Sequence, residues 1–251
     1  MSKSIRKAVL ILNHLTKEPS NLTELAQVVE TPPSTMHRIL RELEDLQLIR
    51  KVGKRYHVGV RLIGLGEAAR RQLDITSVSR GPMERLSQAT RETVHLGLLD
   101  GDKIVYIGKQ EGSRGLQMAS YVGLLSPAQS TAMGKTLIAD LPESAWDGFT
   151  EGIERRTKFT VTDPAEYVDE LHTVRQQGFA LDREENEVGI RCVAAPIRDS
   201  SGKAVAAISL SGAAAYVTKQ RQQELIPDVV ACATEISRQL GFQDEGEARH
   251  A

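Results

Sequence analysis

At 251 residues the chain is long enough for two domains or one large one, and its charged (26%) and hydrophobic (40%) fractions are those of an ordinary globular protein. No apolar run approaches the roughly 18–20 residues of a membrane-spanning helix, so we expect no membrane partner. The two cysteines, Cys192 and Cys232, make neither a disulfide framework nor a zinc spacing. Together with an N-terminus that lacks a secretory core, these features predict a cytoplasmic protein that needs no cofactor or metal.

The formal net charge of −1 is unevenly distributed along the chain. Residues 1–73 hold 13 Lys and Arg against 7 Asp and Glu, a balance of +6, whereas residues 74–251 hold 19 against 26, a balance of −7. A basic N-terminal third on an acidic body is typical of a DNA-binding module joined to a second domain. We therefore expect double-stranded DNA to be a partner of the first third.

In chain order, the first elements are two amphipathic helices. Apolar residues recur at helical spacing over residues 5–15, which predicts the first helix. A second helix is expected over residues 22–29, with Asn21 or Thr23 as its N-cap. The prolines at 32–33 then prevent this helix from continuing, because proline lacks an amide proton and restricts the residue before it.

Residues 34–46, with the sequence STMHRILRELEDL, carry a clear helical pattern. The apolar face comprises Met36, Ile39, Leu40 and Leu43. The opposite face presents polar and basic side chains, namely Thr35, His37, Arg38 and Arg41. Ser34 is expected to cap the helix, because its hydroxyl can accept an amide hydrogen of the first turn. This layout is that of a helix-turn-helix DNA reader, although two ordinary core helices give the same pattern.

Gly53 lies between two short β-prone stretches that are rich in Lys and Arg. The pattern indicates a tight hairpin, the wing of a winged helix. A single surface charge is usually just solvated, but a cluster of them suits contacts with DNA phosphates. The expected phosphate contacts are Ser34, Lys54 and Arg55. The outward residues of the 34–46 helix are expected to read bases in the major groove.

A further helical stretch over residues 62–73 is a natural spacer to a second domain. We place a winged helix-turn-helix DNA-binding domain at residues 1–59, a linker helix at 60–76 and the second domain at 77–251. Its expected strands are 94–99, 104–108, 116–121, 191–198 and 204–210. Its expected helices are 78–90 (begun or broken at Gly81-Pro82), 130–139, 164–177 (between Asp163 as cap and Gly178) and 219–240. Residues 124–129 are expected to form a loop, and the tail after Phe242 to be disordered.

This order of elements predicts an α+β domain with hairpin-linked antiparallel strands. The sequence contains no phosphate-binding loop, dinucleotide fingerprint or nucleophile elbow. We therefore expect the second domain to bind a ligand rather than to catalyse a reaction.

Four segments closely resemble the IclR family of bacterial transcription regulators. They are LTELAQVVETPPSTMHRILRELEDLQLI near the N-terminus, HLGLLDGDKIVYIGK at 95–109, STAMGKTLIA at 130–139 and FALDREENEVGIRCVAAPIRDSSGKAVAAISLSG at 179–212. The resemblance is colinear over nearly the whole chain. It implies an N-terminal winged helix, a linker helix and a GAF-like antiparallel effector-binding domain, assembled as a homodimer or homotetramer.

Within the family, ETVHLGLLDGDKIVYI and DREENEVGIRC are most similar to regulators of sugar-acid catabolism. The resemblance thus implies a repressor that is released by a small carboxylate effector. The sequence departs from the family at Gln129, where a histidine is frequent, and this places a different hydrogen-bond donor beside a bound ligand. The wing is also short.

The resemblance also implies the position of the effector site. In family members with a bound small carboxylate, four polar side chains and two backbone amides at a helix start line the pocket. By motif position, the side chains correspond to Asp182, Cys192, Ser209 and Ser211, and the amides to Ala132 and Met133.

The residue types agree with such a site. A helix that starts at Ser130 or Thr131 offers unpaired amides to a carboxylate, and Ser209 and Ser211, two apart on a strand, face the same side. Asp182 can accept a hydrogen bond from a ligand hydroxyl, which favours a polyhydroxy acid over a simple fatty acid. Each residue also has a structural interpretation. Cys192 is typical of a small core residue, Ser209 and Ser211 could satisfy backbone groups near a strand end, and Asp182 could cap a loop.

The sequence leaves other functions open. A cysteine hydrolase using Cys192 with His95 or His172 lacks a motif that places a base beside the thiol, and it leaves the basic first third unexplained. A transcriptional activator uses the same DNA reader and pocket as a repressor. An effector such as pyruvate, glyoxylate or an aromatic acid also fits these residues.

Overall fold

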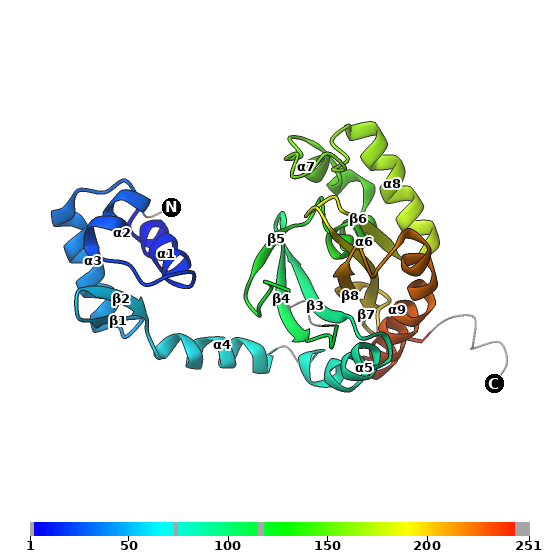
Figure 1. Ribbon diagram of the computed structural model, residues 1–251, viewed down its shortest axis with the longest axis horizontal. Coiled ribbons are helices and arrows are strands. Elements are labelled where there is room, and N and C mark those ends of the chain that lie inside the picture. Colours follow the sequence, from blue (N-terminus) through cyan, green and yellow to red (C-terminus); the bar gives the residue numbers. More distant parts are fainter. Residues whose placement is uncertain (1–2, 73–74, 115–117, 244–251) are drawn as a thin grey trace. The chain divides into compact units, whose positions relative to one another are not determined.

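The computed structural model describes residues 3–72, 75–114 and 118–243 (Figure 1). It divides the chain into two compact units, residues 1–73 and 74–251. The finer division into residues 1–59, 60–76 and 77–251 stays a prediction. Within the described ranges, no helix combines the length and the apolar character that crossing a membrane requires.

The N-terminal unit contains four helices and one hairpin among its described residues. They are α1 (Lys3–Leu15), α2 (Leu22–Val28), α3 (Pro33–Asp45), β1 (Ile49–Val52), β2 (Arg55–Val58) and α4 (Arg61–Gln72). The apolar face predicted for α3 is confirmed, because all four of its residues are buried. They pack with Ile11 of α1, Leu25 of α2 and Ile49 of the hairpin in one core cluster. This is the expected winged helix-turn-helix.

The helix caps of this unit follow the sequence only in part. Asn21 caps α2 in a reciprocal box, in which its side chain accepts the Glu24 amide while the Glu24 carboxylate accepts the Asn21 amide. The prediction that Ser34 caps α3 is wrong, because α3 begins at Pro33 and Pro32 occupies the cap without a side-chain hydrogen bond. Proline opens a helix readily, since it has no amide proton to satisfy and its φ is already helical.

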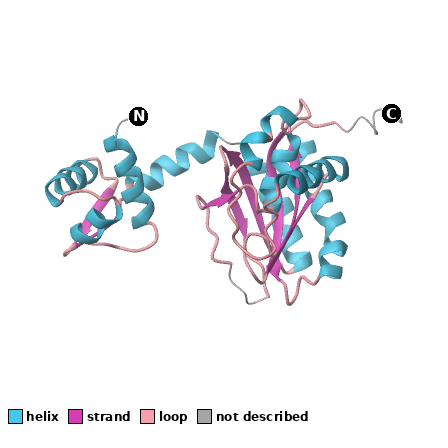
Figure 2. Cartoon of the chain, turned by 90° about the horizontal axis from the view of Figure 1, so that it is seen from above, coloured by secondary structure: helices cyan, strands magenta, loops and turns pink. Residues whose placement is uncertain are grey.

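The C-terminal unit is built on a six-stranded antiparallel sheet, seen as magenta arrows in Figure 2. Its strands are β3 (Thr93–Asp100), β4 (Lys103–Gln110), β5 (Leu125–Pro127), β6 (Ala180–Arg183), β7 (Ile190–Arg198) and β8 (Ala204–Ala213), in the spatial order β5-β4-β3-β8-β7-β6. The described helices are α5 (Ile75–Thr90), α6 (Ala132–Asp140), a 3₁₀ turn (Glu143–Ala145), α7 (Asp147–Thr150), α8 (Pro164–Gln177) and α9 (Lys219–Gln239).

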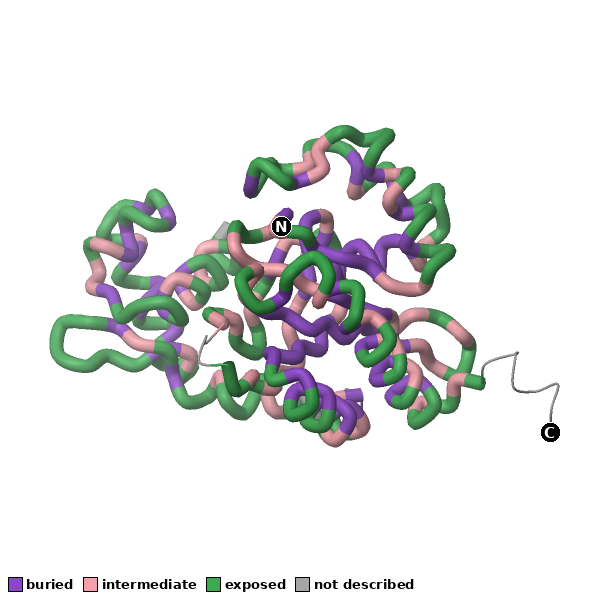
Figure 3. The backbone as a smooth tube through the Cα atoms, turned by 45° about the vertical axis from the view of Figure 1, so that its right-hand side comes forward, coloured by how far each residue is buried: buried purple, intermediate pink, exposed green. Residues whose placement is uncertain are grey.

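Both faces of this sheet are covered, so the middle parts of β3, β7 and β8 are mostly buried (Figure 3). On one face, alanines of β6, β7 and β8 (Ala180, Ala194 and Ala207) pack in a cluster with α6 and α8. On the other face, α5 and α9 contact the sheet. The small residues allow α6 to approach closely, and Gly134 of α6 has no room for a Cβ, which would overlap the carbonyl oxygen of Ala128.

The strand predicted at residues 116–121 is wrong over its described part. Residues 115–117 lie outside the described residues, and residues 118–121 form no strand. Their backbone is held instead by a side chain, because Lys109 Nζ donates to the carbonyl oxygens of Met118 and Ser120. The strand beside β4 is instead β5, which lies within residues 124–129, where the sequence predicted a loop. Its Pro127 is tolerated because β5 is an edge strand, in which one row of backbone amides needs no partner.

Two further elements differ from expectation, and one prediction is not tested. Helix α5 runs from Ile75 through Pro82, so Gly81-Pro82 neither begins nor breaks it. Residues 180–183 form a strand that the sequence pattern did not reveal, because a four-residue edge strand has too little alternation to stand out. The tail predicted to be disordered lies, from residue 244 onward, outside the described residues.

Candidate functional site

The outward face of α3 presents the predicted DNA-reading residues. Ser34, His37, Arg38 and Arg41 are exposed and Thr35 is partly exposed. Arg38 forms a helical ion pair with Glu42 at 3.5 Å, but both side chains are more than 60% exposed, and such pairs contribute little. The guanidinium groups of this face are therefore available to an external anion.

The hairpin has the geometry of a wing, with Gly53 in a left-handed conformation at its turn. Lys54 is exposed at this turn. Arg55 is engaged within the protein, because its Nη1 donates to the carbonyl oxygen of Pro19 at 2.6 Å and lies 3.7 Å from Glu24. Of the two predicted wing contacts, Lys54 is thus the freer one.

An open groove of about 590 Å³ brings the start of α2, the α3 helix and the wing together. His37 of α3 lines it together with Lys51, Lys54 and Tyr56 of the wing. Lys51 lies over the Tyr56 ring, 5.5 Å from its centre. The groove includes Lys51, one of the basic wing residues that the sequence indicated, and adds Tyr56 to that surface.

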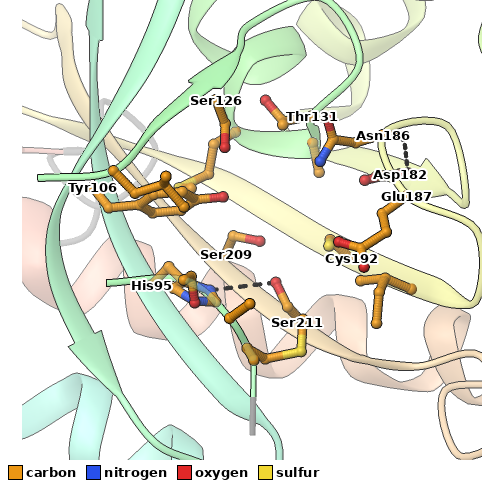
Figure 4. A pocket seen from close by; sticks show the side chains of 17 residues that line it. His95, Tyr106, Ser126, Thr131, Asp182, Asn186, Glu187, Cys192, Ser209 and Ser211 are labelled. Carbon is orange, nitrogen blue, oxygen red and sulfur yellow. Dashed lines mark hydrogen bonds between the residues drawn. The ribbon is translucent and has the colours of Figure 1, made fainter. Parts of the chain in front are cut away.

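The C-terminal unit contains a cavity of about 280 Å³ (Figure 4). All six residues predicted to hold an effector line it: Ala132, Met133, Asp182, Cys192, Ser209 and Ser211. The sequence did not indicate the other polar residues of its lining, which are His95, Tyr106, Ser120, Ser126, Thr131, Asn186 and Glu187. Gln129 is absent from the lining formed by the described residues, so its predicted place beside a ligand is not supported.

The strand register explains how these side chains meet. Asp182 pairs with Cys192 across β6 and β7, and Cys192 pairs with Ser211 across β7 and β8. One step along, Ser209 pairs with His95 of β3. Directly opposed residues in an antiparallel pair share a face, so these polar groups form a patch on the side of the sheet that α6 covers.

The start of α6 forms the opposite wall of the cavity. Thr131 is the N-cap, and its hydroxyl accepts the Gly134 amide at 3.2 Å. The amides of Ala132 and Met133 belong to the first turn, where a helix offers no internal partner, and both residues line the cavity. Unpaired amides and the helix dipole together make this end of the cavity suitable for a carboxylate.

Burial shifts the ionisation of the residues around the cavity. It raises the pKa of Asp182 to about 7, with a further rise from Glu185, against the opposing effects of Lys135 and two backbone amides. Burial and Lys109 together lower the pKa of His95 to about 3, so this ring is neutral and bonds to Ser120 Oγ at 2.7 Å.

A fully buried lysine lies behind the cavity. Nζ of Lys135, on α6, contacts both carboxylate oxygens of Glu185 at 2.8 and 2.7 Å and Oε1 of Glu170 at 2.8 Å. Burial lowers the pKa of Lys135, but the two carboxylates outweigh it, so the net shift is upward. The cluster fixes the loop that follows β6. In this loop the backbone amides of Glu185 and Asn186 donate hydrogen bonds to Asp182 Oδ1.

Two family models match the sequence. The IclR helix-turn-helix domain covers residues 4–53, and the bacterial transcriptional regulator IclR C-terminal domain covers residues 67–238. The chain belongs to the IclR family. It is therefore a helix-turn-helix transcriptional regulator with an effector-binding C-terminal domain, as the resemblance implied.

Members of the IclR family resemble the chain over nearly its full length. The transcriptional regulator KdgR of Escherichia coli K12 is 35% identical over 96% of this chain and 94% of its own. XynR of the same strain is 32% identical over 96% of this chain and 98% of its own. The crystal structure of Thermotoga maritima IclR, at 35% identity, has a TM-score of 0.75 and covers 95% of this chain and 98% of that one.

Of the two histidines that the hydrolase hypothesis invoked, only His95 lines the cavity with Cys192. His172 lies against Trp146, away from the cavity lining, and His95 is occupied by Ser120. Burial and the neighbouring Asp182 raise the pKa of the Cys192 thiol well above its ordinary value. A nucleophilic cysteine needs a depressed pKa, and the shift at Cys192 is in the opposite direction.

Proposed function

We propose that this regulator represses a sugar-acid catabolic operon and that a small carboxylate in the C-terminal cavity releases it from operator DNA. The observation that carries the proposal is the cavity, where helix-start amides face a patch of hydroxyl groups. At about 280 Å³ it is small beside typical ligand pockets of about 300–1,000 Å³, which suits a metabolite of few atoms. The similarity to KdgR and XynR supports a sugar acid, such as an aldonate or a 2-keto-3-deoxy acid.

We propose a homodimer or homotetramer as the DNA-binding form. Apolar side chains are exposed on α1, where Ile5 and Val9 are 66% and 50% exposed, and on α4, where Ile63 is 74% exposed. A second copy of the chain can cover such residues. The two recognition helices of a dimer would then meet half-sites about one helical turn of DNA apart. Effector binding acts on this form through α4, by differential affinity for the DNA-competent arrangement.

Removing two arginines from the exposed face of α3 is expected to weaken specific operator binding strongly. Each good base contact discriminates by about 1–3 kcal/mol, so Arg38→Ala with Arg41→Ala should weaken binding roughly 100-fold. Mobility shifts on DNA upstream of the regulator's own gene and its neighbours measure this, with scrambled DNA as competitor. The matched control, Arg6→Ala with Lys17→Ala, removes the same charge from exposed positions outside α3. Undiminished binding by the α3 variant would contradict the proposal.

Removing a polar group from the cavity is expected to weaken the effector response without changing operator affinity. Ser209→Ala should raise the effector concentration for half-release about threefold to tenfold, since a hydrogen bond contributes about 0.5–1.5 kcal/mol, and Asp182→Ala should also raise it. The readout is release of operator DNA by pyruvate, glyoxylate, gluconate, xylonate or 2-keto-3-deoxygluconate. Ser201→Ala, in an exposed turn, is the matched control. An equal loss of operator affinity in the cavity variants would show that these residues are structural.

Repression and activation are separated by transcription of the neighbouring genes. Deleting the regulator gene should raise their transcription in the absence of a sugar acid, because an empty operator no longer blocks the promoter. A fall in transcription on deletion would instead make the protein an activator with the same DNA reader and cavity.

A further inference from the structure

The charge of the cavity lining conflicts with an acidic ligand. Among its 17 described lining residues there is no lysine or arginine, while Asp182 and Glu187 both carry carboxyl groups. The half-charge at the start of α6 favours one carboxylate, but Asp182 is buried, where repulsion between like charges is strong, and the exposed Glu187 adds a second acid to the lining. A ligand carboxylate therefore meets like charge, unless one of the protein's acids is neutral when it binds.

The cations near the cavity already contact carboxylates of the protein. Lys135 is wholly buried and shared between Glu185 and Glu170, so its single positive charge already serves two carboxylates. Arg183 adds a contact with Glu170 at 3.5 Å from the exposed side. An ionised Asp182 beside this cluster has no counter-charge of its own.

The hydrogen bonds of Asp182 indicate which of its two carboxyl oxygens would carry a proton. The Glu185 amide donates to Oδ1 at 2.7 Å and the Asn186 amide donates to the same oxygen at 3.4 Å. An oxygen that already accepts hydrogen bonds from two amides is poorly suited to carry a proton. The second oxygen, Oδ2, accepts neither of these amides, and the Asp182 side chain lines the cavity beside Cys192 and Glu187 (Figure 4).

We propose that a carboxylate effector enters the cavity together with one proton, which Asp182 carries on Oδ2, so that Asp182 binds the effector as a hydrogen-bond donor. The proton comes from solvent, and no covalent bond of the effector changes. This inference rests on the proposed function, because it takes the effector to be a carboxylate. It replaces the role of Asp182 as an acceptor of a ligand hydroxyl.

The ionisable groups around Asp182 leave it as the acid suited to take up this proton. They are Cys192 on β7, Tyr106 on β4, His95 on β3, Lys135 on α6, Glu170 on α8, and Glu185 and Glu187 in the loop after β6. The pKa of Tyr106 is raised to about 12 and that of His95 is lowered to about 3, so neither group titrates between pH 6 and 8. The pKa of Asp182, about 7, lies inside this window, and a bound anion raises it further.

The test is isothermal titration calorimetry on the full chain at pH 6, 7 and 8. The probes are gluconate, xylonate, 2-keto-3-deoxygluconate, pyruvate and glyoxylate, all ionised throughout this range. A bound probe should have a Kd about tenfold higher at pH 8 than at pH 6, because the empty site must first take up a proton. Titrations at pH 8 in two buffers of different ionisation enthalpy should show uptake of about one proton per probe bound.

Asp182→Asn separates the two roles of this residue. Its amide oxygen can accept the two backbone amides, while its NH₂ donates where the protonated acid would. The variant should therefore lose the pH dependence and bind the same probe about tenfold more tightly than the wild type at pH 8. The matched variant Glu187→Gln, at the other cavity acid, should keep the wild-type slope.

Three results would overturn the inference. A probe that binds the wild type with the same Kd at pH 6 and 8 would show that no proton is taken up, and it would leave the sugar-acid proposal intact. Loss of the slope in Glu187→Gln alone would place the proton on Glu187. If none of the five probes binds at any pH, the proposed effector class fails and this inference fails with it.

Discussion

Replacing Lys135 by methionine is expected to lower the free energy of unfolding of the C-terminal unit by about 3–5 kcal/mol. Methionine has a similar length, so the loss comes from charge rather than from a cavity. Without Nζ, the carboxylates of Glu185 and Glu170, whose side chains are only 4% and 17% exposed, lose the ammonium group that binds both, and Glu170 keeps only its longer contact with Arg183 at 3.5 Å. Leaving a buried charge uncompensated costs more than the intact pair contributes.

The protein offers a local probe for this measurement. Trp146 is the single tryptophan of the sequence, it is 2% exposed, and its indole donates to the carbonyl oxygen of Ile138 on α6. Its fluorescence during urea denaturation of the full chain therefore reports unfolding of the C-terminal unit. Lys103→Met is the matched control, because Lys103 pairs with Asp102 at the surface, where such pairs contribute about 0–1 kcal/mol.

A second substitution distinguishes charge from packing. Adding Glu185→Gln to Lys135→Met removes one of the stranded carboxylates and should restore part of the lost stability. Burial also raises the pKa of Glu185 in the folded wild type, and loss of Lys135 raises it further, so the deficit of Lys135→Met should shrink as the pH falls from 8 to 5. A deficit that is equal at both pH values and unchanged by Glu185→Gln would mean that methionine simply packs badly.

The contacts of Lys135 are a feature that the sequence did not predict. Helical spacing is a local signal, so it identified the buried face of α3 and located the start of α6 to within two residues. The partners of Lys135 lie 35 and 50 residues away in the sequence, and no periodicity connects them. In the sequence this lysine looks like any solvated helix residue.

The effector cavity was predictable to a similar degree. Alternation along β8 places Ser209 and Ser211 on one face, and motif position supplied the other predicted residues. His95 and Tyr106 were missed as lining residues, because their place depends on which strands are neighbours: β3 lies beside β8, 116 residues further along the chain at the contact of His95 with Ser211. The binding roles of all these residues stay predictions until the variants are measured.

Replacing Asp182 by asparagine is expected to stabilise the ligand-free protein at pH 8 by about 2–4 kcal/mol. The folded-state pKa of Asp182, about 7, lies above its ordinary value of about 3.8, so the charged form is disfavoured by folding. The stability associated with this group is fully present below pH 4 and is lost as the pH rises to 7. Asparagine is never charged, so the gain in the free energy of unfolding of Asp182→Asn over the wild type should be full at pH 8 and shrink steadily toward pH 4.

Urea denaturation followed by Trp146 fluorescence at pH 5 and pH 8 measures this difference. Asp199→Asn is the control with the opposite sign, because hydrogen bonds from Ser201 lower the pKa of this exposed aspartate, and its replacement should bring no gain at pH 8. A less stable Asp182→Asn protein at pH 8 would mean that the two backbone amides hold an ionised carboxylate, and Asp182 would then be an acceptor in the cavity. A gain would mean that the aspartate reduces stability at a site where asparagine fits, and such a cost is typical of a residue retained for ligand binding.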